Sequence, residues 1–393
     1  MKKIPIILAT DKNLIPQMYV TILSALKTKD KNSFYEFYCL LQDKLTPWQK
    51  KIFTKLEKKY QNTTINFIKM KNEFADTIVN YPHITVPTYY RLLLAERFPQ
   101  FDKILYLDVD ICVKQDLTAL YETNLGDNYV AGVHSALMLL EEQETIERLK
   151  SFGIKSPDLK TYINAGVTLL NLEQIRKDNK TKELLEFSKQ PLKNNDEDII
   201  NIVFNGKIKL LDFKYNVQPY LLEQEENQEI FKTAYGKENY EQGIKNPVII
   251  HYITGRKPWN TPNVPFAKDW WKIAIKCPLN INAPTNIQKK LISQIKATKG
   301  KKVVFWGASL FLQDSLKHIK GFKNIIGIID GNKSKQGNKL YGYHIYSPDK
   351  LPQIKPDIVI FTIAHNNVYT QIETVLNNSY SSAKLLPNIF ERN

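Results

Sequence analysis

Apolar residues in the first part of the chain occur either in short unbroken runs or at helical spacing. The unbroken runs predict buried strands at 4–9, 37–41, 64–68 and 103–107. Apolar positions three or four residues apart predict helices at 16–28, 47–60 and 89–98. Thr46 and Pro47 suit the N-cap and the first position of the second of these helices. Because strands and helices alternate, the first 275 residues are predicted to form an α/β domain.

The pattern stops between Cys277 and Thr285, where two prolines and two asparagines interrupt any helical or strand period. A basic helix is predicted at about 286–298. A new β-α-β pattern then begins, with strands at 301–307 and 325–330 around an amphipathic segment, and a further strand at 357–363. Three parts are therefore predicted: an α/β domain at 1–275, a linker and basic helix at 276–300, and a smaller α/β domain at 301–393.

Composition narrows the class of protein. The chain has 393 residues, and 43% hydrophobic residues suffice for buried cores, which excludes disorder for most of it. No uncharged apolar run reaches about 18 residues, so no membrane-spanning helix is predicted. The run after Met1 stops at Asp11 and is too short for a signal peptide. Cys39, Cys112 and Cys277 form no CxxC pair, which argues against a disulfide frame or zinc cluster and favours a cytoplasmic protein.

The net charge of +15 is concentrated in the last third of the chain. Residues 276–393 carry a net charge of +11, and the first 275 residues carry only +4. Six lysines lie within fourteen positions: Lys289, Lys290, Lys296, Lys299, Lys301 and Lys302. This cluster is either a solvated face or a peripheral anchor to anionic lipid on the inner face of the cell membrane.

The sharpest chemical feature is the pair Asp108 and Asp110 at the end of the strand predicted at 103–107. Carboxylates at i and i+2 point to the same side of a strand, so both can reach one hard cation through oxygen. A solvated strand end is the alternative explanation of the same two residues.

The segment 101–110 resembles the DxD region of nucleotide-sugar glycosyltransferases with the GT-A fold. Five separated blocks within about 4–270 resemble the retaining glycosyltransferase family 8 in particular. The resemblance implies a GT-A domain with a central mixed sheet, a UDP-sugar donor and a divalent cation, usually Mn²⁺. It further implies that Asp108 and Asp110 share this cation with the diphosphate of the donor.

Three other blocks give the implied donor contacts. The first is 7–13, which corresponds to the segment that holds uracil and ribose. The second contains His83 and Ile84 and then Arg91, which would lie by the donor sugar and the diphosphate. A further block at 162–171 corresponds to the Asn-Ala-Gly segment at the donor sugar. In these blocks and the DxD segment, the resemblance assigns nine residues to the nucleotide sugar. They are Ala9, Thr10, Asp11, Asn13, Ile84, Asp108, Val109, Asn164 and Ala165.

Another block, at 195–199, contains three consecutive carboxylates. The family more often has Asp-Gln-Asp here, and a helix start favoured by its dipole would explain the charges without catalysis. By resemblance, Asp196 would hold sugar hydroxyls, and Glu197 or Asp198 would lie near the anomeric carbon. A carboxylate at 197 makes a covalent route chemically feasible, since it is a better nucleophile than an amide.

The last segment, 248–259, ends an apolar run with His251. A lone histidine there is often a core residue, but the resemblance makes His251 the third metal ligand and Lys257 a phosphate-binding residue. The family usually has glycine three positions after the histidine, whereas this chain has Thr254 followed by Gly255. This difference concerns the backbone contact to the phosphate.

The resemblance therefore implies a retaining, metal-dependent transferase that moves galactose or glucose from a UDP-sugar to a glycan or lipopolysaccharide-type acceptor. The metal, Lys257 and Arg91 would stabilise the UDP leaving group. Covalent and front-face routes both remain open. A sugar nucleotidyltransferase would need a glycine-rich phosphate loop near the start, which 9–13 lacks. A basic polyanion-binding protein is the non-enzymatic alternative, but no nucleic-acid motif is present.

The segment 303–309, followed by Asp330, resembles the first half of a dinucleotide-binding domain. Only Gly307 of the three fingerprint glycines is present, which disfavours a bound cofactor. The region 301–363 resembles the Rossmann-like accessory domains of some bacterial glycosyltransferases and sugar-modifying enzymes. Such a domain would assist binding or assembly without separate catalysis.

Overall fold

The computed structural model describes residues 1–71, 74, 77, 85–154, 159–261, 264–279, 281, 284–317, 319, 322–363 and 366–390. The chain forms two compact units. The first unit contains Met1–Ile253 and Lys268–Asn280, and the second contains Thr254–Ala267 and Ile281–Asn393. The segment 254–267 thus packs with the second unit, whereas the sequence analysis assigned it to the first domain. The three predicted domain ranges stay a prediction.

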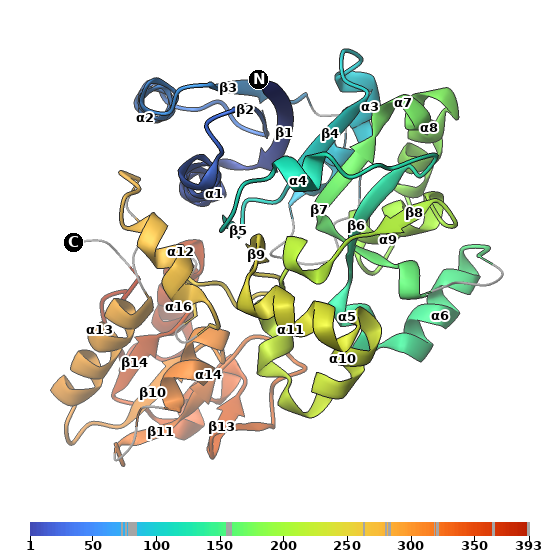
Figure 1. Ribbon diagram of the computed structural model, residues 1–393. Helices are drawn as coiled ribbons and strands as arrows, with labels where there is room; N and C mark the ends of the chain where they lie inside the picture. Colours follow the sequence, from blue (N-terminus) through green and yellow to red (C-terminus); the bar gives the residue numbers. More distant parts are fainter. Residues whose placement is uncertain are drawn as a thin grey trace. The chain divides into compact units, whose positions relative to one another are not determined.

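A seven-stranded mixed sheet lies at the centre of the first unit (Figure 1). β1 is parallel to β2 and β4, and β2 is parallel to β3. β7 is antiparallel to β4 and β6, and β6 is parallel to β8. The order across the sheet is β3 (Thr63–Lys69), β2 (Ser33–Leu41), β1 (Lys2–Thr10), β4 (Lys103–Leu107), β7 (Ile163–Asn171), β6 (Val130–His134) and β8 (Ile208–Leu210). The predicted mixed α/β fold is confirmed.

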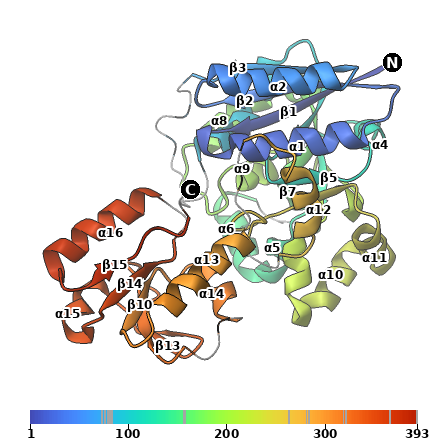
Figure 2. The ribbon, with the colours of Figure 1, turned by 90° about the vertical axis from the view of Figure 1, so that its left-hand side faces the viewer.

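Both faces of β1 are buried, because its side chains alternate between two apolar cores. Ile4, Ile6 and Leu8 belong to a core that includes the apolar faces of α1 (Ile15–Thr28) and α2 (Pro47–Lys59). Figure 2 shows both helices running alongside β1 and β2. Ile7 and Ala9 belong to the opposite core. That core includes side chains from α3 (Leu94–Arg97), α7 (Leu172–Lys177), α8 (Lys180–Phe187) and α9 (Asn195–Val203).

The first unit also contains a second, smaller sheet and several further helices. A separate two-stranded antiparallel sheet joins β5 (Ile111–Val113) to β9 (Ile249–His251). The other helices are α4 (Thr118–Tyr121), α5 (Ala136–Leu140), α6 (Glu142–Ser151), α10 (Gln228–Tyr235) and α11 (Lys237–Lys245). α12 (Ala267–Ala274) begins at the boundary between the two units.

The second unit contains a six-stranded sheet. Its strands are ordered β12 (Lys339–Leu340), β13 (Tyr343–Tyr346), β11 (Ile325–Ile329), β10 (Val303–Trp306), β14 (Ile358–Phe361) and β15 (Lys384–Leu385). All pairings are parallel except β12 with β13. Across the sheet, the five parallel strands follow one another as the third, second, first, fourth and fifth of them along the chain. The first five strands of a doubly wound sheet have the same order.

Helices cover both faces of this second sheet. One core contains side chains from α13 (Pro284–Ala297) and α14 (Leu310–Leu316), and the other contains side chains from α15 (Leu351–Ile354) and α16 (Asn366–Ser379). The predicted basic helix is therefore α13, which buries Ile287, Leu291 and Ile295. Its lysines Lys289, Lys290 and Lys296 are exposed.

The structure confirms the strands and helices predicted in the first 70 residues, and Thr46 caps α2 as expected. The helix predicted at 89–98 is different. Its first half belongs to a 3₁₀ helix, η2 (Val86–Leu93), which is followed by the short α3. The three-residue repeat of a 3₁₀ helix aligns Thr88 with Arg91 on one side, which bears on the site below. Among the described residues, no helix is both long and apolar enough to cross a membrane.

Candidate active site

Three predicted metal ligands meet where β4 ends. Asp108 follows β4 directly, and its N–H donates to the carbonyl of Gly166 at 2.8 Å. Asp110 precedes β5, whose antiparallel pairing with β9 sets Ile111 opposite His251. Nε2 of His251 lies 3.2 Å from Oδ1 of Asp110 and 3.7 Å from Oδ2 of Asp108. The short β5–β9 ladder therefore brings together ligands 141 positions apart in the sequence.

The donor set and the space around it fit a divalent cation. One atom from each of Asp108, Asp110 and His251 lies within 4.8 Å of the others. A Cβ at Gly166 would lie 2.2 Å from Cε1 of His251 and 2.6 Å from Oδ2 of Asp108, so a side chain there would displace the cluster. Two carboxylates with one imidazole form a borderline donor set, which suits Mn²⁺ better than Ca²⁺.

Arg91 connects this cluster to the helix α9. Its side chain is only 2% exposed. Nη2 lies 2.7 Å from Oδ1 of Asp108, and Nε lies 3.0 Å from Oδ2 of Asp196. Nη1 donates to the carbonyl of Ala165 at 2.5 Å, and the guanidinium lies 4.1 Å from the centre of the Tyr106 ring. The planar, permanently charged group thus holds the buried Asp196 and the partly buried Asp108 in fixed positions.

Glu197 lies in the first turn of α9 and faces β7. Its Oε2 accepts from Nδ2 of Asn164 at 2.8 Å and from the N–H of Ala165 at 3.2 Å. Its Oε1 accepts from Oγ of Ser135 at 2.8 Å. Burial raises the pKa of Glu197 to about 7, although the hydrogen bonds from Ser135 and from the N–H of Ala165 act in the opposite direction. A carboxyl with this pKa exchanges its proton near neutral pH.

The two aspartates beside Glu197 differ in their surroundings. Asp196 accepts from Oγ1 of Thr88 at 2.6 Å and pairs with Arg91; burial raises its pKa and Arg91 opposes this. Asp198 has a fully buried side chain that faces the protein core. Its oxygens accept from Tyr162, from the N–H of Asn194 and from Arg148. These contacts fix the Asp198 carboxylate in the first turn of α9.

The segment predicted to bind uracil and ribose lies at the carboxyl end of β1. Ala9, Thr10 and Asp11 are buried, and Oδ1 of Asp11 accepts from the N–H of Asn13 at 2.7 Å. β1 lies between β2 and β4, and the strand order reverses there. Ligands of open α/β sheets bind at such a switch point.

Val109, also predicted to contact the donor, is buried between the two aspartates of the cluster. Its carbonyl accepts from Oγ1 of Thr21 at 2.8 Å. The same hydroxyl oxygen of Thr21 also lies 3.0 Å from the carbonyl oxygen of Ile111. The loop that carries Asp108 and Asp110 is therefore fixed to α1.

Four residues that were predicted to contact the donor do not belong to the described part of the first unit. Ile84 lies outside the described residues. Thr254, Gly255 and Lys257 belong to the second unit. Thr254, where the family usually has glycine, adopts φ +67°, a left-handed conformation that favours glycine. The N–H of Lys257 donates to Oδ1 of Asn260 at 2.9 Å, which closes a compact turn.

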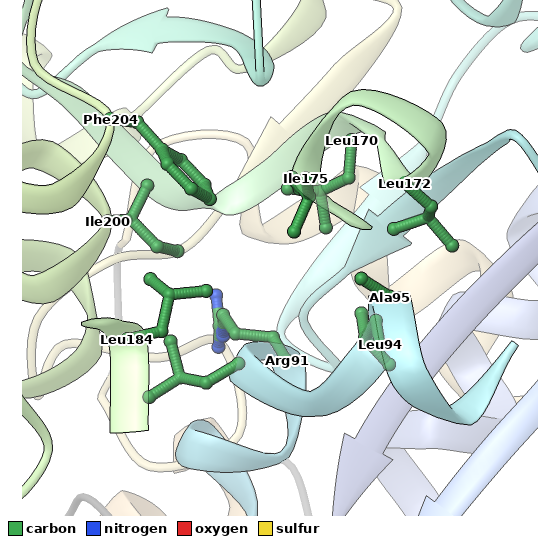
Figure 3. Close-up of a pocket in the computed structure, with 10 residues that line it drawn as sticks. Arg91, Leu94, Ala95, Leu170, Leu172, Ile175, Leu184, Ile200 and Phe204 are labelled. Atoms are coloured by element: carbon green, nitrogen blue, oxygen red, sulfur yellow. The ribbon is translucent and has the colours of Figure 1, made fainter. Parts of the chain in front are cut away.

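A small cavity behind Arg91 is not a donor site. Figure 3 shows that the labelled side chains around it are apolar apart from Arg91, and its volume of about 10 Å³ holds no more than one water molecule. The lining comes from η2, α3, β7, α7, α8 and α9. It is a packing gap between the helices and the sheet.

Several residues of the site were not assigned roles from the sequence. Ser135, Tyr106 and Asn216 contact Glu197, Arg91 and His251 respectively. Asn216 precedes Val217, which bridges to Ile250, in a segment where polar and apolar residues alternate. Such alternation is typical of a strand with one solvated face, so the pattern alone would place Asn216 in solvent.

The dinucleotide-like loop of the second unit is closed by its own side chains. Oδ2 of Asp330 accepts from the N–H of Ala308 at 2.8 Å, and Oγ of Ser309 caps α14 by accepting from the N–H of Leu312 at 3.1 Å. A Cβ at Gly307 would lie 2.2 Å from Ile363. Gly307 thus allows close internal packing, and Asp330 holds this loop.

Comparison with known proteins gives matches to both parts of the chain. The model of Glycosyl transferase family 8 matches residues 5–262, and the model called C2185-like, N-terminal matches residues 299–386. General stress protein A of Bacillus subtilis is 25% identical over 263 residues, which cover 65% of this chain and 87% of that protein. Lipopolysaccharide 1,3-galactosyltransferase of Salmonella typhimurium is 26% identical over 265 residues, which cover 64% and 71%.

Among solved structures, galactosyltransferase LgtC in complex with donor and acceptor sugar analogs has a TM-score of 0.58 and 25% identity. The match covers 70% of this chain and 97% of that one.

Proposed function

Because this chain belongs to glycosyl transferase family 8, we propose that it transfers galactose or glucose from a UDP-sugar to a glycan or lipopolysaccharide-type acceptor, with retention at the anomeric carbon. The observation that carries the proposal is the convergence of Asp108, Asp110 and His251 beside the buried Arg91. The similarity to a lipopolysaccharide galactosyltransferase supports the acceptor class.

Asp108, Asp110 and His251 would hold Mn²⁺ or another divalent cation. When bound, this cation supplies positive charge to the diphosphate of a UDP leaving group. Arg91 keeps Asp108 oriented toward the cluster through the contact between Nη2 and Oδ1. Since Arg91 never deprotonates, its positive charge persists while negative charge develops on the departing diphosphate.

The donor sugar would lie beside Asn164, Ala165 and Glu197. Asn164 and Glu197 form a hydrogen-bonded pair, and Asp196 is fixed by Arg91 and Thr88. Glu197 would act at the anomeric carbon, as a nucleophile or as a charge that stabilises an oxocarbenium ion. The buried contacts of Asp198 do not support its predicted catalytic role, so we propose that it anchors α9.

Uracil and ribose would bind at the end of β1, through Ala9, Thr10, Asp11 and Asn13. The backbone at Val109 would complete this side of the donor. Contacts from Ile84, Thr254, Gly255 and Lys257 remain proposals that rest on the resemblance of their segments to the family.

Calorimetric titration with UDP tests the proposed function. In the presence of Mn²⁺ we expect UDP to bind at least about tenfold more tightly than in EDTA, because the cation bridges the carboxylates and the diphosphate. The Asp108→Asn, Asp110→Asn double variant should lose this difference. Equal UDP affinity with and without Mn²⁺ in the wild type would refute a metal-dependent transferase and favour the polyanion-binding alternative.

The second unit would be a Rossmann-like accessory domain without a cofactor of its own. Its strand order supports this assignment, and the self-contacts of Asp330 and Ser309 argue against a dinucleotide. We further propose a cytoplasmic location with peripheral contact between the exposed lysines of 286–302 and anionic lipid at the inner face of the cell membrane.

Charge removal tests the membrane proposal without disturbing the fold. The variant with glutamine at the six lysines of 289–302 should bind phosphatidylserine vesicles at least about 100-fold more weakly at low salt, since each lysine contributes about 1 kcal/mol. Lys50, Lys51 and Lys55 on α2, also exposed, provide matched control substitutions. Cosedimentation measures the binding, and equal binding of wild type and the six-lysine variant would contradict the proposal.

A further inference from the structure

Asn216 is a buried amide between the metal cluster and the site proposed for the donor sugar. It is the C-cap residue of the 3₁₀ helix η4 (Phe213–Tyr215), and it is 0% exposed. Its backbone N–H donates to the carbonyl of Phe213, and the adjacent Val217 pairs with β9. The main chain therefore fixes Asn216 beside the strand that carries His251.

The side chain of Asn216 connects two functional residues. Its Oδ1 lies 3.1 Å from Nδ1 of His251, and its Nδ2 donates to Oδ1 of Asn164 at 2.9 Å. Asn164 in turn donates through Nδ2 to Oε2 of Glu197. The buried amide of Asn216 thus links His251 directly to Asn164, and it reaches Glu197 through Asn164.

The direction of each hydrogen bond in this chain follows from its ends. Oδ1 of Asn164 also accepts from the N–H of Gly166 at 3.2 Å, so the atom of Asn216 that faces it must be a donor. The other end of the Asn216 amide is then the oxygen, which can only accept. His251 must therefore carry a proton on Nδ1, which leaves Nε2, the nitrogen that faces Asp108 and Asp110, as the one available to bind a cation.

We propose that Asn216 is a positioning residue that holds His251 in the tautomer able to bind a cation and couples this ligand to Asn164 and Glu197. The inference deepens the proposed function and rests on it for the identity of the cation. Residues that fix the tautomer of a metal-binding histidine typically change metal affinity 10–100-fold when they are removed. Asn216 is neither a metal ligand nor a contact of the reacting atoms.

Asn216→Leu removes both hydrogen bonds while keeping a side chain of similar size. We expect its Mn²⁺ affinity, measured without UDP from the electron paramagnetic resonance of free Mn²⁺, to fall 10–100-fold. Gln218→Leu is the matched control. Gln218 is an equally buried amide two residues further on, but it contacts Ala136 and the carbonyl of His134 instead of the cluster. Its Mn²⁺ affinity should stay within about twofold of the wild type.

Asn216→Asp separates the two roles of the amide. A carboxylate at 216 still accepts from Nδ1 of His251 but cannot donate to Asn164. This variant should keep Mn²⁺ affinity within about threefold of the wild type while kcat falls about tenfold or more. It also keeps the proposal testable if Asn216→Leu does not fold.

The tautomer itself can be read in the protein without metal or UDP. In ¹⁵N-histidine-labelled enzyme, the wild-type signal of His251 should report a protonated Nδ1. Asn216→Leu should shift His251 toward the other tautomer, and loss of a signal in His251→Gln assigns the resonance. The readout is independent of donor binding, so it separates failure of this inference from failure of the proposed function.

An unchanged His251 signal together with unchanged Mn²⁺ affinity in Asn216→Leu would overturn the inference. An equal loss of Mn²⁺ affinity in Gln218→Leu would overturn it as well, because general loosening of the site would then explain both variants.

Discussion

Arg91→Ala is expected to lower the free energy of unfolding by about 3–5 kcal/mol and to reduce sugar transfer at least about 100-fold. Arg91 is buried between Asp108 and Asp196, and its removal would leave both carboxylates without the guanidinium that they share. Burial alone would lower the pKa of Arg91, but these two carboxylates hold it above its ordinary value. Urea denaturation and an assay of UDP release measure the two effects.

Two variants separate charge from geometry in this prediction. Arg91→Lys keeps the positive charge but loses the planar fork, so stability should recover more than activity does. Arg176→Ala is the control for loss of a partly buried arginine. Arg176 donates to the carbonyls of Ala95 and Phe101 and lies away from the cluster. If Arg91→Ala were no less stable than Arg176→Ala, the ion pairs of Arg91 with Asp108 and Asp196 would not have the importance assigned to them.

Glu197→Gln is expected to lower kcat about 100-fold or more while UDP affinity with Mn²⁺ changes little, because the amide cannot act as a nucleophile or carry charge. With a pKa of about 7, Glu197 ionises as pH rises through neutrality. The wild-type rate should therefore rise with a midpoint near pH 7, and the variant should lack this limb. Full transferase activity of purified Glu197→Gln enzyme would exclude a chemical role for this carboxylate.

The same raised pKa predicts how stability depends on pH. Between the ordinary pKa of a glutamate and about 7, the folded protein binds a proton at Glu197 that the unfolded chain does not. The stabilisation from this carboxyl is complete at low pH and is lost as pH rises through 7. Glu197→Gln should consequently gain stability relative to the wild type between pH 5.5 and 8. Exposed Glu173, on α7, provides the matched control Glu173→Gln.

The strands of the first sheet could be predicted because burial on both faces leaves a direct signal in the sequence. β1 and β4 are unbroken apolar runs, and α2 has both its N-cap Thr46 and the adjacent Pro47. The segment 86–97 was less predictable. Its residues are buried on several sides, so their spacing does not distinguish a 3₁₀ helix from an α-helix.

Candidate site residues could be named wherever a short motif carries them. Asp108 and Asp110 are two residues apart in the sequence, and the resemblance to a family supplied His251 as their partner. Their convergence depends on the pairing of β5 with β9, which no local pattern encodes. Three neighbouring carboxylates in α9 look alike in the sequence, yet Asp196 meets Arg91, Glu197 meets Asn164, and Asp198 faces the core. Helical geometry turns each of them toward a different neighbour.

The α/β class, the main strands, the concentration of positive charge after residue 275 and the residue types of a cation site could all be predicted from the amino-acid sequence. The folded chain was needed to show which side chains share that site, that Gly166 leaves room for it, and that Asn216 is buried against His251. The two kinds of feature differ in the sequence separation of the residues that make them. Helices and strands follow from the periodicity of neighbouring residues, whereas a site is made by contacts such as Arg91 with Asp196 and Asn216 with Asn164, whose partners are distant along the chain and meet only in the folded protein.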